Sequence, residues 1–133
     1  MAKNNRSAQI LRQLLELFPK ELKAPILAET FAQAEQLKSE MIFRVPVREG
    51  GGGGTLRNSI RVEKGQKPMR VLVRAGGDST KVHGYDYANA QEFGTEKQSA
   101  QPFFWVSYRK RKTKIRRAIK NAAIDAIKRN WHA

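Results

Sequence analysis

The chain has no cysteine and only two histidines. Without cysteine, disulfide bonds, thiolate metal ligands and thiol chemistry are excluded. His83 lies beside Gly84 and His132 is the penultimate residue, so neither stands in a metal-binding spacing such as His-Glu-x-x-His. The sequence therefore predicts no metal site and no cofactor.

Long apolar runs are also missing. The longest nearly apolar run, Ala24 to Ala28, is far too short to cross a bilayer. The stretch from Ile10 to Phe18 is interrupted by polar and charged residues, whereas a secretory signal needs an unbroken apolar segment. We therefore expect no membrane partner and no secretory signal.

Acidic residues are scarce: twelve Asp and Glu stand against 26 Lys and Arg, a net charge of +14. Ten of the basic residues follow Ser107, where Asp125 is the one acid, so this segment carries +9. Such an excess favours a polyanionic neighbour, either DNA bound without sequence preference or an acidic protein. A solvated helical face is the plainer interpretation. The candidates for facing a polyanion are Arg109, Lys110, Arg111, Lys112, Lys114, Arg116, Arg117 and Lys120.

No catalytic constellation is recognisable. Ser59 lacks the Gly-x-Ser-x-Gly setting of an exposed nucleophile. Asp86 and Glu92 could pair as acid and base, but scattered carboxylates make such pairs easy to propose. Since no nucleophile, base and orienting group come together in the pattern, we predict that the protein is not an enzyme.

Apolar spacing predicts two N-terminal helices. The first covers Ile10 to Phe18, with Ser7 as N-cap and Pro19 as its end. The second begins near Leu22, with Pro25 in its first turn, and runs to about Met41. Its apolar stripe serves either the core or a seam with a partner.

Five consecutive glycines, Gly50 to Gly54, form the strongest break in the chain. A phosphate-binding loop needs spaced glycines followed by Lys and Ser or Thr at the start of a helix, which this segment lacks. We therefore predict a flexible loop at about 48–55 that becomes ordered against a neighbouring subunit.

The following segments predict strands and then one long helix. Leu56 to Val62 alternates in polarity, Gly65 to Pro68 makes a turn, and Met69 to Arg74 returns antiparallel. A third strand is predicted at Tyr85 to Phe93. From Pro102 the period changes to that of a basic helix at about 103–130. Phe103, Phe104 and Trp105 cannot all face one side, so one or two should reach the core and the rest a neighbouring subunit. A role in the core alone is the plainer interpretation.

Three ordered segments carry a family resemblance. They are Thr55-Leu56-Arg57-Asn58-Ser59-Ile60, then Tyr87-Ala88 with Glu92-Phe93-Gly94-Thr95, and finally Gln101-Pro102-Phe103-Phe104 before the basic helix. In this order they resemble the gene-product-ten family of tailed phages and prophages, whose members are assigned to head–tail joining or tail completion. The resemblance covers roughly Gln33 to the C-terminus.

The resemblance implies an α+β single domain over residues 1–133, with N-terminal helices and a long C-terminal helix packed on a small antiparallel sheet. It implies a virion subunit that forms a homo-oligomeric ring and contacts other neck and tail proteins, such as a tail terminator, head-closure or connector proteins and the tape measure. A stand-alone nucleic-acid-binding protein of a prophage is the alternative. The candidates for assembly contacts are Gly50, Gly51, Gly52, Gly53, Gly54, Arg57, Glu92, Phe93, Thr95, Phe103, Phe104 and Trp105. Local turns and cross-strand bonds are an equally good interpretation of Arg57, Glu92 and Thr95.

Overall fold

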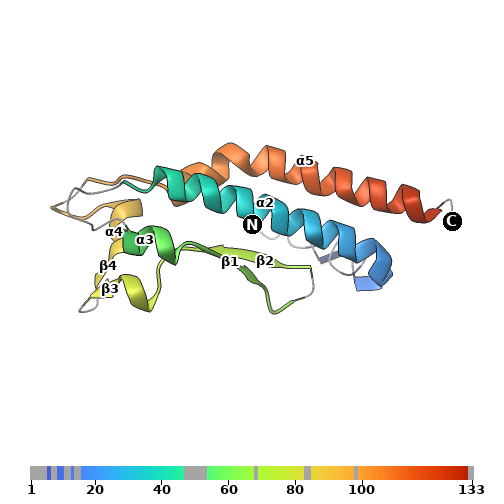
Figure 1. The fold of residues 1–133 in the computed structure, drawn as a ribbon, viewed down its shortest axis with the longest axis horizontal. Helices are drawn as coiled ribbons and strands as arrows, with labels where there is room; N and C mark the ends of the chain where they lie inside the picture. The colour runs from blue at the N-terminus through green and yellow to red at the C-terminus, as the bar shows by residue number, and fades with distance from the viewer. Residues whose placement is uncertain are drawn as a thin grey trace.

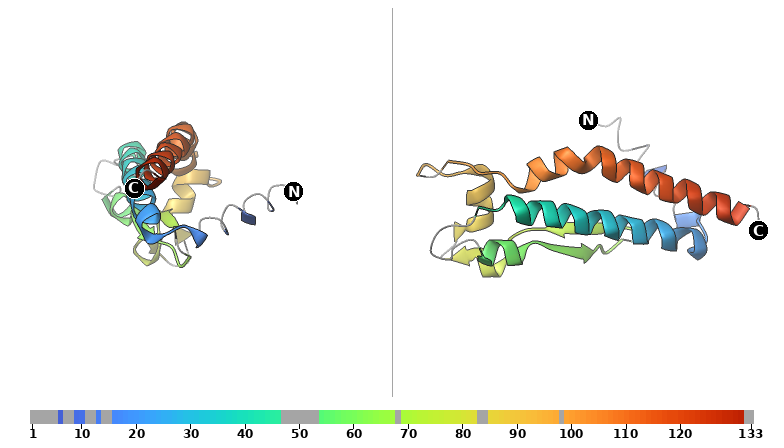
Figure 2. Two further views of the ribbon diagram at one scale, coloured as in Figure 1. Left: turned by 90° about the vertical axis from the view of Figure 1, so that its right-hand side faces the viewer. Right: turned by 45° about the horizontal axis from the view of Figure 1, so that its top comes forward.

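The computed structural model describes residues 6, 9–10, 13, 16–46, 54–67, 69–82, 85–97 and 99–131. Two long antiparallel helices, α2 (Lys20–Arg44) and α5 (Phe104–Trp131), lie side by side (Figure 1). A hairpin of β1 (Arg61–Lys64) and β2 (Val71–Arg74) packs on the other side of α2 (Figure 2). The short elements gather at one end of the elongated molecule: α3 (Gly54–Ser59), η1 (Asp78–Thr80), β3 (Lys81–Val82), β4 (Tyr85–Asp86) and α4 (Tyr87–Phe93). The α+β architecture with a long C-terminal helix is as predicted.

Helix α2 follows from its apolar spacing. Ile26, Ala34, Leu37 and Met41 are buried at helical intervals, which confirms the predicted helix. The helix is longer than predicted at both ends. The predicted position of Pro25 was wrong, because the helix starts at Lys20 and places this proline in the second turn. There Pro25 has no N–H to donate to the carbonyl of the preceding turn.

The first predicted helix is described only in part. Arg6, Gln9, Ile10, Gln13, Glu16 and Leu17 are helical, and the chain bends at Phe18 before Pro19. The proposed cap at Ser7 lies outside the described residues.

Helix α5 packs along α2. Ser107 and Ala126 are fully buried, and the Ser107 hydroxyl donates to the carbonyl of Phe103 at 2.6 Å. Arg111 joins the two helices, because its guanidinium donates to Glu40 and Gln36 of α2.

The prediction of a strand over Leu56 to Val62 was wrong in its first half. Residues Gly54–Ser59 form α3, and the strand begins at Arg61. Leu56 and Ile60 lie four residues apart, a spacing that suits one helix face as well as one strand face, and both are buried in the core. The Ser59 hydroxyl donates to the carbonyl of Leu56 at 2.6 Å, which favours the turn of helix.

The hairpin itself is as predicted, with Val62 opposite Val73 and Arg61 opposite Arg74. Like charges facing each other are unfavourable. Glu63 offsets this repulsion, because its carboxylate accepts from Arg61 Nε at 2.6 Å and lies 3.2 Å from Arg74 Nε.

The predicted third strand, Tyr85 to Phe93, was also largely wrong. Only Tyr85–Asp86 is a strand, paired with Lys81–Val82, and Tyr87–Phe93 is the helix α4. Asp86 favours the helix over the predicted strand. Its Oδ1 accepts from the backbone N–H of Ala88 and from the Thr80 hydroxyl, both at 2.9 Å. An aspartate in this N-cap position starts a helix, and the alanines that follow favour it.

The core lies at the end where the short elements gather. Its buried members come from α2, α3 and α4 and from residues that directly follow or precede a helix, namely Leu37, Met41, Val45, Leu56, Ile60, Ala88 and Phe103. None of the helices in the described part of the chain is long and apolar enough to span a membrane.

Gly76 joins the hairpin to this core. Its φ is +84°, and a Cβ there would lie 2.9 Å from the Cβ of Ala88. Its N–H donates to the Ser59 hydroxyl at 2.9 Å, and its carbonyl accepts from Arg61 Nη1 at 2.7 Å. A residue without a side chain is therefore required where the loop crosses α4.

We predict that Gly76→Ala lowers the free energy of unfolding by roughly 1–3 kcal/mol, through a strained φ and the collision with Ala88. Urea denaturation followed by circular dichroism measures the change. Asn58→Ala, at an exposed position of α3, is the control and should stay within about 0.5 kcal/mol of the wild type. Equal stability of Gly76→Ala and the wild type would contradict the argument.

Candidate functional site

The carboxylate of Glu92 binds the start of α5. Its Oε2 accepts from the backbone N–H groups of Phe103 and Phe104 at 2.9 Å each, and its Oε1 accepts from that of Trp105 at 3.0 Å. Glu92 is buried and lies on α4, eleven residues before Phe103. A helix N-terminus has free amide donors and partial positive charge, both of which a buried carboxylate satisfies. Glu92 is therefore a long-range cap for α5.

This cap determines how the three aromatic residues point. Phe103 is 1% exposed and lies in the core, Phe104 packs against the core, and Trp105 is 48% exposed. Successive rings meet edge to face, with centroid distances of 6.3 Å for Phe103–Phe104 and 5.1 Å for Phe104–Trp105. Two of the three aromatics thus belong to the core side, and Trp105 presents about half of its surface to solvent.

The chain leaves α4 through Phe93 and Gly94. Gly94 adopts φ +77°, a conformation open to glycine that ends α4 and turns the chain away. The base of the following loop is closed by Gln91, whose backbone carbonyl accepts from Gln101 N at 2.8 Å and whose Nε2 donates to Gln101 Oε1 at 2.9 Å. Thr95 is exposed in this loop, and its hydroxyl accepts from the N–H of Lys97.

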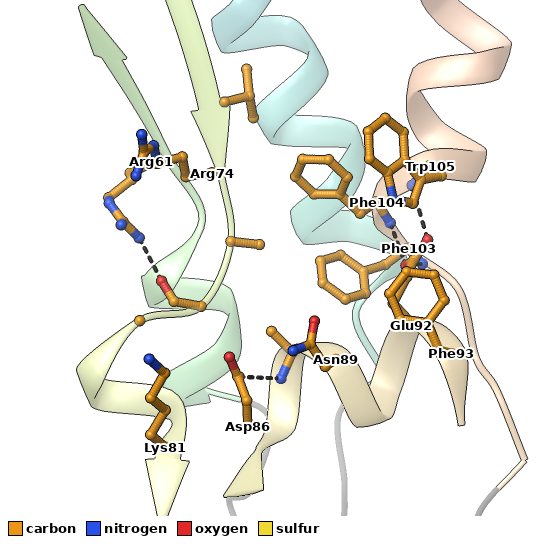
Figure 3. Close-up of a pocket in the computed structure, with 15 residues that line it drawn as sticks. Arg61, Arg74, Lys81, Asp86, Asn89, Glu92, Phe93, Phe103, Phe104 and Trp105 are labelled. Atoms are coloured by element: carbon orange, nitrogen blue, oxygen red, sulfur yellow. Dashed lines mark hydrogen bonds between the residues drawn. The ribbon is translucent and has the colours of Figure 1, made fainter. Parts of the chain in front are cut away.

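An open cleft of about 460 Å³ lies between the hairpin, α4 and the start of α5 (Figure 3). Arg61, Arg74 and Lys81 line it from one side, and Glu92, Phe93 and Trp105 from the other. Asp86 and Glu92, the acid pair considered from the sequence, both line this cleft. Both carboxylates accept hydrogen bonds that start helices, so each has a structural task.

A second, apolar groove of about 290 Å³ continues from the cleft, because Val73, Phe104 and Trp105 line both. On the α2 side it is lined by Ala34, Leu37 and Met41. The two hollows thus adjoin at these three residues, of which Trp105 is half-exposed.

Four exposed aromatic side chains belong to elements at this same end. They are Phe43 (86% exposed), Tyr87 (43%), Phe93 (67%) and Trp105 (48%). Sequence reasoning found Phe93 and Trp105 but missed Phe43 and Tyr87. Phe43 could have been found, since it follows the buried Met41 by two residues and so lies on the opposite side of α2. We call these four residues the aromatic end.

Arg57 is the remaining assembly candidate with a described side chain. Its Nη2 donates to the carbonyl of Val45 at 3.0 Å, so it ties α3 to the end of α2. Gly50 to Gly53 lie outside the described residues, and Gly54 is the first residue of α3. The predicted Gly-rich loop at 48–55 therefore ends earlier than expected.

The basic residues of α5 divide into two groups. Arg111 is directed inward: its Nη1 donates to Glu40 Oε1 at 3.1 Å, its Nη2 to Gln36 Oε1 at 2.5 Å, and its side chain is 16% exposed. The other seven candidates are exposed, and within the described ranges they have no hydrogen bond or ion pair from their side chains. We call these seven the cationic face: Arg109, Lys110, Lys112, Lys114, Arg116, Arg117 and Lys120.

Comparison with known proteins gives one family. The family model described as "Bacteriophage HK97-gp10, putative tail-component" matches residues 8–94, more than half of the chain. The match includes α2, the hairpin and α4 with Glu92, and it ends before α5. No significant match was found among the curated proteins or the solved structures.

We predict that Glu92→Gln lowers the free energy of unfolding by roughly 1–3 kcal/mol, because an amide offers one acceptor oxygen where two now serve three N–H groups that are buried or partly buried. Chemical denaturation measures the loss. Glu96→Gln removes the same charge from an exposed loop position and should change stability by less than about 0.5 kcal/mol. If both variants were equally stable, the cap would have no energetic importance.

Arg111 and Arg109 provide a second matched pair. Arg111→Gln should cost about 1–2 kcal/mol, since it leaves Glu40 without its cation in a partly buried position. Arg109→Gln removes an exposed charge and should change the stability by no more than about 0.5 kcal/mol. Thermal unfolding of the two variants, compared at one pH and salt concentration, distinguishes them. If Arg109→Gln were the less stable variant, the contacts of Arg111 with α2 would not stabilise the protein.

Proposed function

Because the chain belongs to the HK97-gp10-like family of bacteriophage tail components, we propose that it is a structural subunit of the head–tail junction. It completes the tail or joins it to the head as a member of a ring of identical copies. Its neighbours in this proposal are the tail terminator and head-closure or connector proteins.

The aromatic end carries this proposal. Four large aromatic side chains, led by Phe43 and Phe93, are exposed where α2 ends, α4 lies and α5 begins. Exposed apolar patches rimmed by polar residues mark protein interaction surfaces. Aromatic residues are also the ones that contribute most when an interface forms. A neighbouring subunit that covers these rings would remove their apolar surface from water.

The distribution of apolar side chains supports a ring. Leu17, Ile124 and Ile127 are exposed near the opposite end of the helix pair, where α2 begins and α5 ends (Figure 1). Two different apolar surfaces on one subunit favour a head-to-tail contact between copies, in which one surface meets the other. Such heterologous contacts close into rings when the rotation between subunits allows it.

The fold keeps the aromatic end in one arrangement. Glu92 holds the start of α5 and therefore Trp105, while Gln91 and Gln101 close the loop that follows Phe93. Side chains held in place before binding lose less conformational freedom on association. Thr95, in the same loop, and the glycines before α3 remain candidates for further contacts with a neighbour.

The test is a double substitution at the aromatic end. Phe93→Ser with Trp105→Ser should leave the subunit folded, because both side chains are exposed and the amide of Trp105 still reaches Glu92. We expect loss of ring or tail co-assembly in size-exclusion chromatography with light scattering. We also expect at least about a tenfold fall in infective particles from a phage that carries the variant gene.

Glu96→Ser with Lys97→Ser is the matched control, since both residues are exposed in the loop next to Phe93 and the net charge is unchanged. This variant should assemble as the wild type does. A phage with the aromatic double substitution that still joined heads to tails normally would refute the proposal. Normal particles after deletion of the gene would instead favour a stand-alone nucleic-acid-binding protein.

A further inference from the structure

The cationic face consists of exposed residues of α5. Successive helix residues are about 100° apart, which divides the seven residues into two rows. One row contains Arg109, Lys112, Arg116 and Lys120, and the other contains Lys110, Lys114 and Arg117. Arg111, which pairs with Glu40 of α2, marks the side of α5 that packs on α2. All seven residues of the two rows are exposed, so both rows face solvent.

Within the described ranges, no acidic side chain pairs with the residues of the cationic face. The sequence between Glu96 and Asp125 contains neither Asp nor Glu, and the ion pair of Arg111 with Glu40 is made on the packing side. Along each row, cations stand three or four residues apart, a spacing at which like charges repel and destabilise a helix. The isolated subunit thus carries an unfavourable charge pattern that a polyanionic partner would relieve.

The composition of this face favours a nucleic acid over an acidic protein. Every exposed residue from Arg109 to Asn121 is polar or charged. Interfaces between proteins usually have an apolar centre, in which charged residues are depleted. Phosphate recognition needs no such centre, because Lys and Arg neutralise the backbone and release its counterions.

The spacing of the charges also suits duplex DNA. The segment from Arg109 to Lys120 extends over roughly 17 Å at 1.5 Å per residue. A DNA duplex carries one phosphate charge per about 1.7 Å of its axis, hence about ten over the same length. Two rows of long, flexible side chains on a convex helix can reach several of these phosphates.

We propose that the cationic face of α5 binds the phosphate backbone of double-stranded DNA without sequence preference. The cationic face begins at Arg109, one turn after Trp105 of the aromatic end, and extends along α5 away from that end. In this proposal one subunit holds a neighbour at its aromatic end and DNA along the helix. The inference rests on the proposed function only for the source of the DNA, which is the duplex that passes between head and tail.

The experiment measures binding of the full-length protein to a labelled duplex of arbitrary sequence over a range of salt concentrations. The triple variant Lys112→Gln, Arg116→Gln and Lys120→Gln removes three charges from one row. We expect its affinity to fall more than tenfold at about 0.1 M salt and the slope of log K against log salt to become shallower by up to about 2.7.

The control variant carries Lys20→Gln, Lys64→Gln and Lys97→Gln, three exposed lysines on other elements. It has the same net charge as the triple variant and should bind DNA nearly as the wild type does. An equal loss in both variants would overturn the proposal, because general charge and not α5 would then cause binding. Failure of the wild type to bind duplex would overturn it too, as would tighter binding of polyglutamate than of DNA at the same salt concentration.

The outcome is independent of the assembly test. The substitutions in α5 leave Phe93 and Trp105 unchanged, and the aromatic double substitution leaves the cationic face unchanged. Loss of DNA binding with normal assembly, or the reverse, therefore identifies which of the two proposals fails.

Discussion

The contact between Glu92 and the first amides of α5 is the constraint on which the rest of the structure depends. One carboxylate serves three backbone N–H groups, at 2.9 to 3.0 Å, across eleven or more residues of sequence. It joins the small elements at one end of the molecule to the longest helix. The position of Phe103 in the core and of Trp105 at the surface both follow from it. A charged acceptor in a buried place is unfavourable unless fully bonded, and here the helix terminus supplies the donors.

Helix α5 has two faces with different physical tasks. Towards α2 it offers Arg111, whose ion pair with Glu40 is partly shielded from water. Towards solvent it offers seven cations without partners in the described part of the chain. Both faces belong to one helix. The packing of α5 on α2 therefore determines which cations form ion pairs within the subunit and which stay exposed to a partner. The aromatic end and the cationic face adjoin on α5, where Trp105 lies one turn before Arg109.

Much of the fold was predictable from local pattern. The helix over Lys20–Arg44, the hairpin with Val62 and Val73, and the basic helix from Phe104 all have a clear apolar period. The errors came at short segments, where one spacing fits two structures. Leu56 and Ile60 are compatible with a strand and with a turn of helix, and Tyr87–Phe93 became helical because Asp86 caps it. Contacts from distant residues, such as Gly76 with Ser59, decide such cases.

The sequence by itself determined the α+β fold class, the two long helices, the excess of positive charge and the family to which the chain belongs. These depend on composition and on periods within one element. Only the tertiary structure decided that Glu92 caps α5, that Arg111 faces inward, and that Phe43 and Tyr87 join Phe93 and Trp105 at one end. The reason is physical: a side chain's partner across a fold depends on how elements pack, and local sequence periodicity carries no record of that packing.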